Sequence, residues 1–227
     1  MFILTIISSL FVNMKKKSEN GSKYYRFLLE SCIKIAMVAA RVHIHVTGAE
    51  MIPEDRRYLL VGNHISNFDP ILAVHLFRKN KLIFVSKPEN FKQPVFGPVV
   101  HACGFLSIDR DSPRNALKTI IEASNIIKED RFSVGIYPEG TRNFGREPLL
   151  PFHNGSLKIA QMAHAPIVVV ASRNTREIAK HFPWRGSNVY VDVLGVIEPE
   201  EIEGLKTDAI GERIREMLTA KLSEPID

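Results

Sequence analysis

From Val42 onward, the chain alternates between short apolar runs and longer stretches in which apolar residues recur every three or four positions. Short apolar runs are typical of buried strands, and the three-to-four spacing is typical of helices that pack on a sheet. Strands are expected at Val42–Thr47, Arg57–Val61, Leu82–Val85, Phe105–Ile108, Phe132–Ile136, Ile167–Ala171 and Val189–Val196. Helices are expected at Pro70–Arg78, Pro94–Ala102, Pro113–Lys128, Gly155–Ala163 and Ile210–Leu222.

This alternation predicts an α/β fold, a mainly parallel twisted sheet flanked by helices, which we assign to residues 42–227. In sheets of this type, ligands bind outside the carboxyl ends of the strands. The loops that follow three of the expected strands carry unusual combinations of polar residues, so we expect the chemistry of the protein there.

Residues 1–41 follow a different pattern and are expected to form an N-terminal membrane-docking helical segment. Residues 1–14 are almost wholly apolar, and Lys15, Lys16 and Lys17 follow at once. A secretory signal would carry its positive charge before the apolar stretch, and a full span needs about 20 apolar residues. We therefore expect residues 1–14 to dip into one leaflet, with the lysines at the headgroups. A mobile N-terminal tail is the alternative.

The stretch Lys23–Arg41 is expected to be a helix with one narrow polar stripe. Arg26, Glu30 and Lys34 follow one another at four-residue steps, which is salt-bridge spacing, and most other positions are apolar. A helix that is apolar over most of its circumference is buried in a core or lies in a bilayer interface. We expect it to dock on the membrane with the preceding segment. Packing on the domain is the alternative, and both can hold, one for each side of the helix.

Composition narrows the choice of partners. With 227 residues, the chain is long enough for one sizeable core and short for two. Its net charge of +5 fits an anionic membrane surface or a phosphate-bearing substrate, and it is weaker than the charge that nucleic-acid binders often carry. One Trp and five Tyr offer no evident stacking platform for single strands, so no nucleic-acid partner is expected.

Cysteine and histidine spacing gives no metal site. Cys32 and Cys103 lie far apart, which agrees with a reducing compartment and provides no disulfide framework. His43 and His45 share one face of an expected strand, but no third ligand lies nearby in sequence.

The loop after the second expected strand reads NHISNFDP and contains His64 and Asp69. The Asp69 carboxylate is close enough in sequence to fold back onto the imidazole, fixing one ring nitrogen as a donor and leaving the other as a base. The pair lacks an enzyme nucleophile, so a substrate hydroxyl is the candidate. Ser66 is nearby, but no Gly-x-Ser-x-Gly elbow of a hydrolase occurs. Alternatively, Asp69 is the N-cap of a helix that begins at Pro70, and His64 is structural.

Two further loops carry candidate phosphate ligands. Arg110 follows the strand at Phe105–Ile108 and precedes a helix N-terminus, where a guanidinium is suited to clasp a phosphate. A solvated arginine paired with Asp109 or Asp111 is the alternative.

The other loop, Ile136-Tyr137-Pro138-Glu139-Gly140-Thr141-Arg142, is expected to be a turn. It presents Glu, Thr and Arg side chains together, which is more polar groups than the formation of a turn requires. Its Glu139 is suited to accept hydrogen bonds from substrate hydroxyls and its Arg142 to hold a phosphate. Backbone N–H groups around Gly140 can face a developing oxyanion. Lys87, just after the strand at Leu82–Val85, adds another positive charge.

The blocks NHISNFDP, GFLSIDR, IYPEGTR and APIVVV, in this order, resemble the glycerolipid acyltransferase family, specifically the 1-acylglycerol-3-phosphate acyltransferases of bacterial type. Each block alone is a weak signal, whereas the ordered set is specific, and the resemblance covers Val42 to Val196. It implies that His64 is the general base and Asp69 its orienting partner. It further implies that the acceptor's phosphate and glycerol are bound by Arg110, Glu139, Gly140, Thr141 and Arg142. Lys87 matches a basic position in relatives.

The resemblance also implies a reaction and its partners. An acyl group would move from acyl carrier protein or coenzyme A, as a thioester co-substrate, to the sn-2 hydroxyl of 1-acylglycerol 3-phosphate (lysophosphatidic acid), giving phosphatidate for phospholipid biosynthesis. No cofactor and no metal are implied. The expected location is the cytoplasmic face of the cell membrane, as a peripheral or monotopic protein. The alternatives are another acceptor, glycerol 3-phosphate or a lysophospholipid, or a non-catalytic lipid-phosphate binding protein.

The chain departs from the family pattern in places. Tyr137 stands where phenylalanine is common, and His153 stands where relatives often have lysine. The N-terminal region is short for a family that usually docks firmly on membranes.

Overall fold

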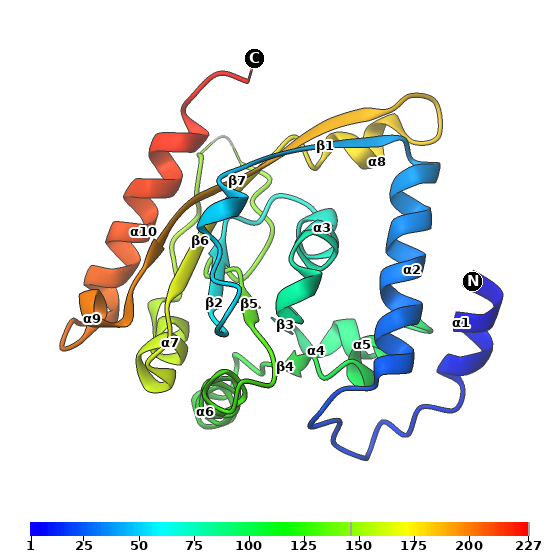
Figure 1. Ribbon diagram of the computed structural model, residues 1–227, viewed down its shortest axis with the longest axis horizontal. Helices are drawn as coiled ribbons and strands as arrows, with labels where there is room; N and C mark the ends of the chain where they lie inside the picture. The colour runs from blue at the N-terminus through cyan, green and yellow to red at the C-terminus, as the bar shows by residue number, and fades with distance from the viewer. Residues whose placement is uncertain (146, 227) are drawn as a thin grey trace.

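A seven-stranded sheet forms the centre of the computed structural model, which describes residues 1–145 and 147–226 (Figure 1). The strand order is β1-β7-β6-β2-β5-β3-β4, and every neighbouring pair is parallel except β6 and β7. The strands are β1 (Val42–Thr47), β2 (Leu59–Gly62), β3 (Ile83–Ser86), β4 (Leu106–Ser107), β5 (Val134–Ile136), β6 (Ile167–Arg173) and β7 (Ser187–Ile197). The prediction of an α/β fold with a mainly parallel sheet is confirmed, and each expected strand is present with its ends shifted by up to two residues.

Helices cover both faces of the sheet (Figure 1). They are α1 (Phe2–Ser9), α2 (Lys23–Ala39), α3 (Phe68–Leu76), α4 (Pro88–Phe91), α5 (Phe96–Ala102), α6 (Pro113–Lys128), α7 (Lys158–Ala163), α8 (Glu177–His181), α9 (Pro199–Ile202) and α10 (Thr207–Leu222). The short helices α4, α8 and α9 were not expected, because one turn is too short to show an apolar period. Helix α8 lies in the connection that lets β7 return antiparallel to β6.

Side-chain alternation along the strands divides the core in two. Leu59 and Val61 of β2 face a cluster that includes side chains of α6, α7 and α10. Tyr58 and Leu60 face the opposite cluster, built with α2, α3 and α5. Successive strand residues point to opposite faces, so a strand apolar at every position must be covered on both sides.

Helix α2 belongs to the second of these clusters. Leu29 and Ile33 are buried there, and Arg26 forms an ion pair with Glu30 at 2.6 Å and donates a hydrogen bond from Nη1 to the carbonyl of Leu82. Its opposite side is apolar and exposed, with Val38 71% exposed. The expected boundary at residues 41 and 42 falls between α2 and β1, yet α2 packs on the α/β domain.

Helix α1 lies beside α2 (Figure 1). Ser8 Oγ is 2.8 Å from the Tyr24 hydroxyl, and the hydroxyl of Tyr25 donates to the carbonyl of Ser8. Among the helices that the structure describes, none is both long enough and apolar enough to cross a bilayer.

Shortening Leu28 to alanine is expected to lower the free energy of unfolding by about 2–5 kcal/mol, because a fully buried side chain leaves a cavity. The Val38→Ala variant, on the exposed side of α2, is expected to stay within about 0.5 kcal/mol of the wild type. Urea denaturation of both variants checks this. Equal stability of the Leu28→Ala protein and the wild type would mean that α2 does not fold as part of the domain.

Candidate active site

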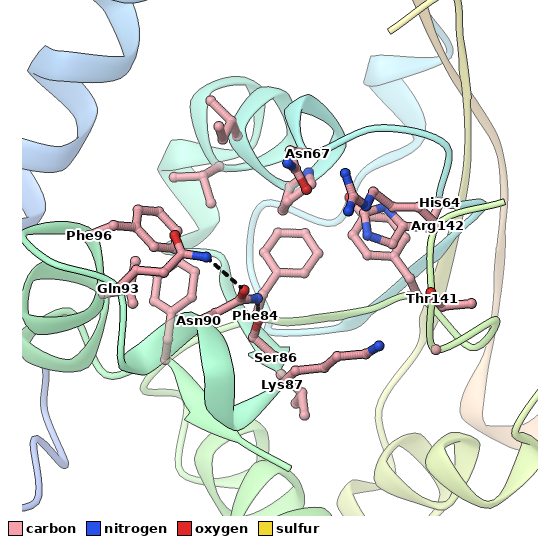
Figure 2. A pocket seen from close by; sticks show the side chains of 18 of the residues that line it. His64, Asn67, Phe84, Ser86, Lys87, Asn90, Gln93, Phe96, Thr141 and Arg142 are labelled. Atoms are coloured by element: carbon pink, nitrogen blue, oxygen red, sulfur yellow. Dashed lines mark hydrogen bonds between the residues drawn. The ribbon is translucent and has the colours of Figure 1, made fainter. Parts of the chain in front are cut away.

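A cavity of about 460 Å³ opens at the carboxyl ends of β2, β3 and β5. It brings together most of the residues singled out by sequence, and Figure 2 shows several of them around the same space. The expected site residues that line it are His64, Lys87, Arg110, Gly140, Thr141 and Arg142. Asp69 and Glu139 lie behind this lining and are almost fully buried.

His64 and Asp69 form the expected pair. The His64 Nδ1 lies 2.9 Å from Asp69 Oδ2, and the Asp69 side chain has no exposed surface. Since a carboxylate accepts, Nδ1 is the donor, and in the neutral ring Nε2 then keeps its lone pair. The imidazole is therefore arranged as a base.

The same carboxylate organises the loop around it. Asp69 Oδ2 also accepts the backbone N–H groups of Ile65 and Ser66, both at 2.7 Å, and Oδ1 accepts a short hydrogen bond from the Thr175 hydroxyl. Helix α3 begins at Phe68, so Asp69 lies within its first turn. The alternative in which Asp69 is the N-cap is therefore wrong, because the carboxylate is bound by the preceding loop and by His64.

Backbone hydrogen bonds clamp His64 itself. Its N–H donates to Glu139 Oε1 at 2.7 Å, and its carbonyl accepts the N–H of Asn143 at 2.7 Å. Glu139 Oε2 accepts the N–H of Leu150 at 2.8 Å. The pKa of Glu139 lies above its ordinary value, because burial raises it more than these two backbone donors lower it. Both carboxylate oxygens are thus engaged by the protein, and this differs from the expectation that Glu139 meets substrate hydroxyls.

An aromatic stack supports the imidazole from one side. The rings of His64 and Tyr137 lie 4.4 Å apart at 10°, and Tyr137 stacks on Phe84 at 5.3 Å. Burial raises the pKa of the Tyr137 hydroxyl well above its ordinary value, so the ring stays neutral beside Asp69. The departure from phenylalanine thus preserves a flat, uncharged surface under His64.

The backbone conformation at position 140 requires glycine. Its φ is 71°, and a Cβ there would collide with the guanidinium of Arg110, whose Nη1 donates a short hydrogen bond to the Gly140 carbonyl. Burial of the guanidinium lowers the pKa of Arg110 from its ordinary value, but an arginine stays charged. The ring of His153 also lies against this position.

The remaining cations lie near His64. Figure 2 shows Arg142 next to His64, and Lys87 extending from the end of β3 toward the same side of the cavity. The Arg142 guanidinium also lies over the ring of Phe144, 5.0 Å from its centroid. Two positive charges therefore line the same cavity as His64, and no Asp or Glu is among the described residues of its lining.

The far end of the cavity is mainly apolar, with the amide side chains of Asn90 and Gln93 beside it. Figure 2 shows Phe96 on the side opposite His64. The apolar lining comes from α2, α3 and α5 and includes Leu29, Ile33, Ile71, Val74, Phe96 and Val100. The space can therefore hold a charged group beside His64 and a hydrocarbon chain beyond it.

His45 and the hydroxyl of Ser66 are both engaged by neighbouring residues. His45 stacks on Tyr190, with ring centroids 4.8 Å apart, and its Nε2 lies 3.0 Å from Asn188 Oδ1. Ser66 is buried, and its Oγ accepts the N–H of Phe68. In residues 1–145 and 147–226, no group of three or more His, Cys, Asp or Glu side chains is placed to hold a metal ion.

A family model described as Acyltransferase matches residues 43–173, which include all four sequence blocks. The chain belongs to this acyltransferase family. It is 30% identical over 197 residues to the 1-acyl-sn-glycerol-3-phosphate acyltransferase of Borreliella burgdorferi, covering 86% of this chain and 78% of that one. It is 29% identical over 163 residues to the enzyme of the same name from Haemophilus influenzae, covering 70% and 66%.

A solved structure supports the fold of the acyltransferase. The crystal structure of the 1-acyl-sn-glycerophosphate (LPA) acyltransferase from Thermotoga maritima matches with a TM-score of 0.73 at 20% identity, covering 99% of this chain and 89% of that chain. The resemblance drawn from the four blocks is thereby confirmed at the level of family and fold.

Sequence reasoning missed residues that hold the site of this acyltransferase together. Asn63 joins β2 to β6 through two hydrogen bonds with the backbone of Ser172, at 2.9 and 2.7 Å. Thr175 reaches Asp69 from 106 positions away and lies just beyond the family match. No local pattern marks either residue, because their partners are brought near only by strand pairing.

Replacing Thr175 with valine, which has the same shape, is expected to lower the kcat of the acyltransferase at least about tenfold, with little change in KM. General-base catalysis contributes about 10²–10⁴, and Asp69 would lose one of the donors that hold it in place. Steady-state kinetics check this, with Thr175→Ser expected to recover most of the activity. Thr219→Val on α10 is the matched control. A valine variant with unchanged kcat would remove Thr175 from the positioning of the pair.

Replacing Glu139 with glutamine distinguishes support of His64 from contact with substrate. The amide can accept only one of the two N–H groups, so kcat is expected to fall roughly tenfold or more while the KM for the acceptor stays nearly constant. A raised KM with unchanged kcat would instead show that the carboxylate binds the acceptor.

Proposed function

We propose that this acyltransferase moves a fatty acyl group from a thioester to the sn-2 hydroxyl of 1-acylglycerol 3-phosphate, forming phosphatidate. The observation that carries the proposal is the His64–Asp69 pair at the charged end of a cavity whose other end is apolar. An acceptor of this kind carries a free hydroxyl that fits the His64–Asp69 pair, a phosphate that fits the charged end and a fatty chain that fits the apolar end. The names of the curated relatives support the same acceptor.

His64 is assigned as the general base. Its Nε2 removes the proton of the acceptor hydroxyl as the oxygen attacks the thioester carbonyl, and the proton then leaves with the thiolate. Asp69 holds the tautomer and stabilises the imidazolium formed on the way. The substrate hydroxyl is the nucleophile, so the reaction needs no acyl-enzyme.

The charged end of the cavity is assigned to the phosphate and to the oxyanion. Lys87, Arg110 and Arg142 supply positive charge for the phosphate. The N–H of Gly140 donates to the Tyr137 carbonyl at 3.0 Å, so the oxyanion is assigned to the next groups along the loop, beginning with Thr141.

The lipid substrate is proposed to reach the site from a bilayer. Helices α1 and α2 would dock on the cytoplasmic face as a peripheral or monotopic attachment, because their outer sides are apolar. Acyl carrier protein and coenzyme A present the same thioester, and either serves as donor in this mechanism.

The test is acyl transfer by the purified protein in detergent, comparing the wild type with His64→Ala. 1-Acylglycerol 3-phosphate, glycerol 3-phosphate and a lysophospholipid are each offered with either thioester donor. The wild type is expected to form phosphatidate, and His64→Ala is expected to lose roughly 10²–10⁴ of the rate. His43→Ala, on the exposed face of β1, is the matched control.

Each other result has a defined meaning. Full activity of His64→Ala contradicts the general-base assignment. Transfer to a different acceptor keeps the mechanism and changes the substrate. A folded protein that binds the lipid and transfers nothing would instead be a lipid-phosphate binding protein.

A further inference from the structure

The single tryptophan of the chain lies on the surface. Trp184 is 84% exposed and Phe182 is 52% exposed, both in the turn between α8 and β7. Two large aromatic side chains placed together in water are unusual for a soluble surface, since each leaves much apolar area unburied.

The turn that carries them is well supported. The N–H groups of Trp184 and Arg185 both donate to the His181 carbonyl, at 2.8 and 3.0 Å. The Arg41 guanidinium donates to the Pro183 carbonyl at 2.6 Å. The indole is therefore presented by a turn whose backbone groups are engaged, and its exposure is a feature of the fold.

The turn lies beyond the C-terminal end of α2, because Arg41 follows that helix and contacts Pro183 (Figure 1). The outer face of α2 leads toward it. The exposed apolar residues of that face lie within an arc of about 80°, at about 100° per residue, and are Tyr24, Phe27, Ile35 and Val38.

Helix α1 continues the same surface alongside the N-terminal half of α2 (Figure 1). It packs near Tyr24 and Cys32 and leaves several apolar side chains exposed. They are Phe2, Ile3, Leu4, Ile6 and Ile7, followed by Leu10 and Phe11. A helix of 17 residues is about 25 Å long, so the two ends of this apolar surface are well separated.

Positive charges border the surface. Lys23 and Lys34 are exposed on the same side of α2, and Arg41 and Arg185 are exposed at the turn. The Arg185 guanidinium donates to His181 Nε2 and that of Arg41 to the Pro183 carbonyl. Among the ion pairs between side chains of residues 1–145 and 147–226, none includes any of these four cations. Cations beside exposed aromatic side chains match the headgroup region of an anionic bilayer, where amphipathic rings and lipid phosphates meet.

We propose that the turn at residues 182–185 is a second bilayer contact, in which Trp184 and Phe182 enter the headgroup region and Arg41 and Arg185 meet lipid phosphates. This rests on the proposed function, which brings the lipid substrate from a bilayer. Contacts through α1 and the adjoining half of α2 alone would leave the C-terminal end of α2 free to move away from the bilayer. A second contact at the far end of α2 holds this helix along the membrane, and with it the cavity wall formed by Leu29 and Ile33.

A bilayer fits this surface better than an acidic carrier protein does. A carrier would be recognised through paired charges, whereas here an indole and a phenyl ring are exposed, 84% and 52%. The surface is also continuous with the apolar side of α1, which has the composition of a membrane-facing helix.

The experiment measures the tryptophan fluorescence of the full-length wild-type protein, which comes from Trp184 because the chain has one tryptophan. Vesicles of phosphatidylcholine, with or without phosphatidylglycerol, are added, and binding is measured in parallel by co-sedimentation. On anionic vesicles the emission is expected to shift to shorter wavelength and to be quenched by lipids brominated near the headgroup. Trp184→Ser is expected to weaken vesicle binding roughly tenfold or more, because a large apolar side chain is lost.

A matched control moves the reporter to the other side of the molecule. Trp184→Phe combined with Leu205→Trp places the only indole between α9 and α10, at a residue that is 45% exposed, and it should give no shift. Leu205→Ser should leave vesicle binding unchanged.

Several outcomes overturn the proposal. Vesicle binding without a change in Trp184 emission, or no vesicle binding at all, would show that the turn does not contact a bilayer. A Trp184→Ser variant that binds vesicles normally but has a raised KM for the carrier-linked donor only would assign the turn to the carrier protein. Acyl transfer in detergent is measured separately, so failure of this contact and failure of the proposed function can be distinguished.

Discussion

The buried carboxylate of Asp69 is the group on which the rest of the site depends. Removing a carboxylate from water is costly unless donors surround it, and here they come from His64, Ile65, Ser66 and Thr175. These bonds fix the path of the loop, the tautomer of the imidazole and the position of the segment that follows β6. The need to satisfy one carboxylate therefore organises both His64 and the loop that carries it.

Parallel pairing supplies the other half of the arrangement. The loops after β2, β3 and β5 begin at the same edge of the sheet, so His64, Lys87 and Arg142 meet there although they are distant in sequence. Glu139 then joins two of these loops by accepting the N–H of His64. The position of His64 is thus fixed through its backbone N–H and carbonyl, which bind Glu139 and Asn143.

Helix α2 connects the interior of the enzyme with its surface. Its buried side places Leu29 and Ile33 on the cavity wall, and its outer side exposes Phe27 and Val38. Both alternatives drawn from the sequence, packing on the domain and docking on a membrane, are compatible with these two sides. Under the proposed function, the element that lines the hydrocarbon end of the cavity is also the one nearest the bilayer.

The sequence by itself determined the α/β class, the seven strands and the closeness of His64 to Asp69, because apolar periodicity and five-residue spacing are local properties. Only the tertiary structure decided that β7 runs antiparallel to β6, that Glu139 faces inward and that Thr175 binds Asp69. These features depend on the path of the chain between partners that are from about 10 to more than 100 positions apart. Local pattern records which residues are buried, whereas strand order and loop packing decide which buried groups meet.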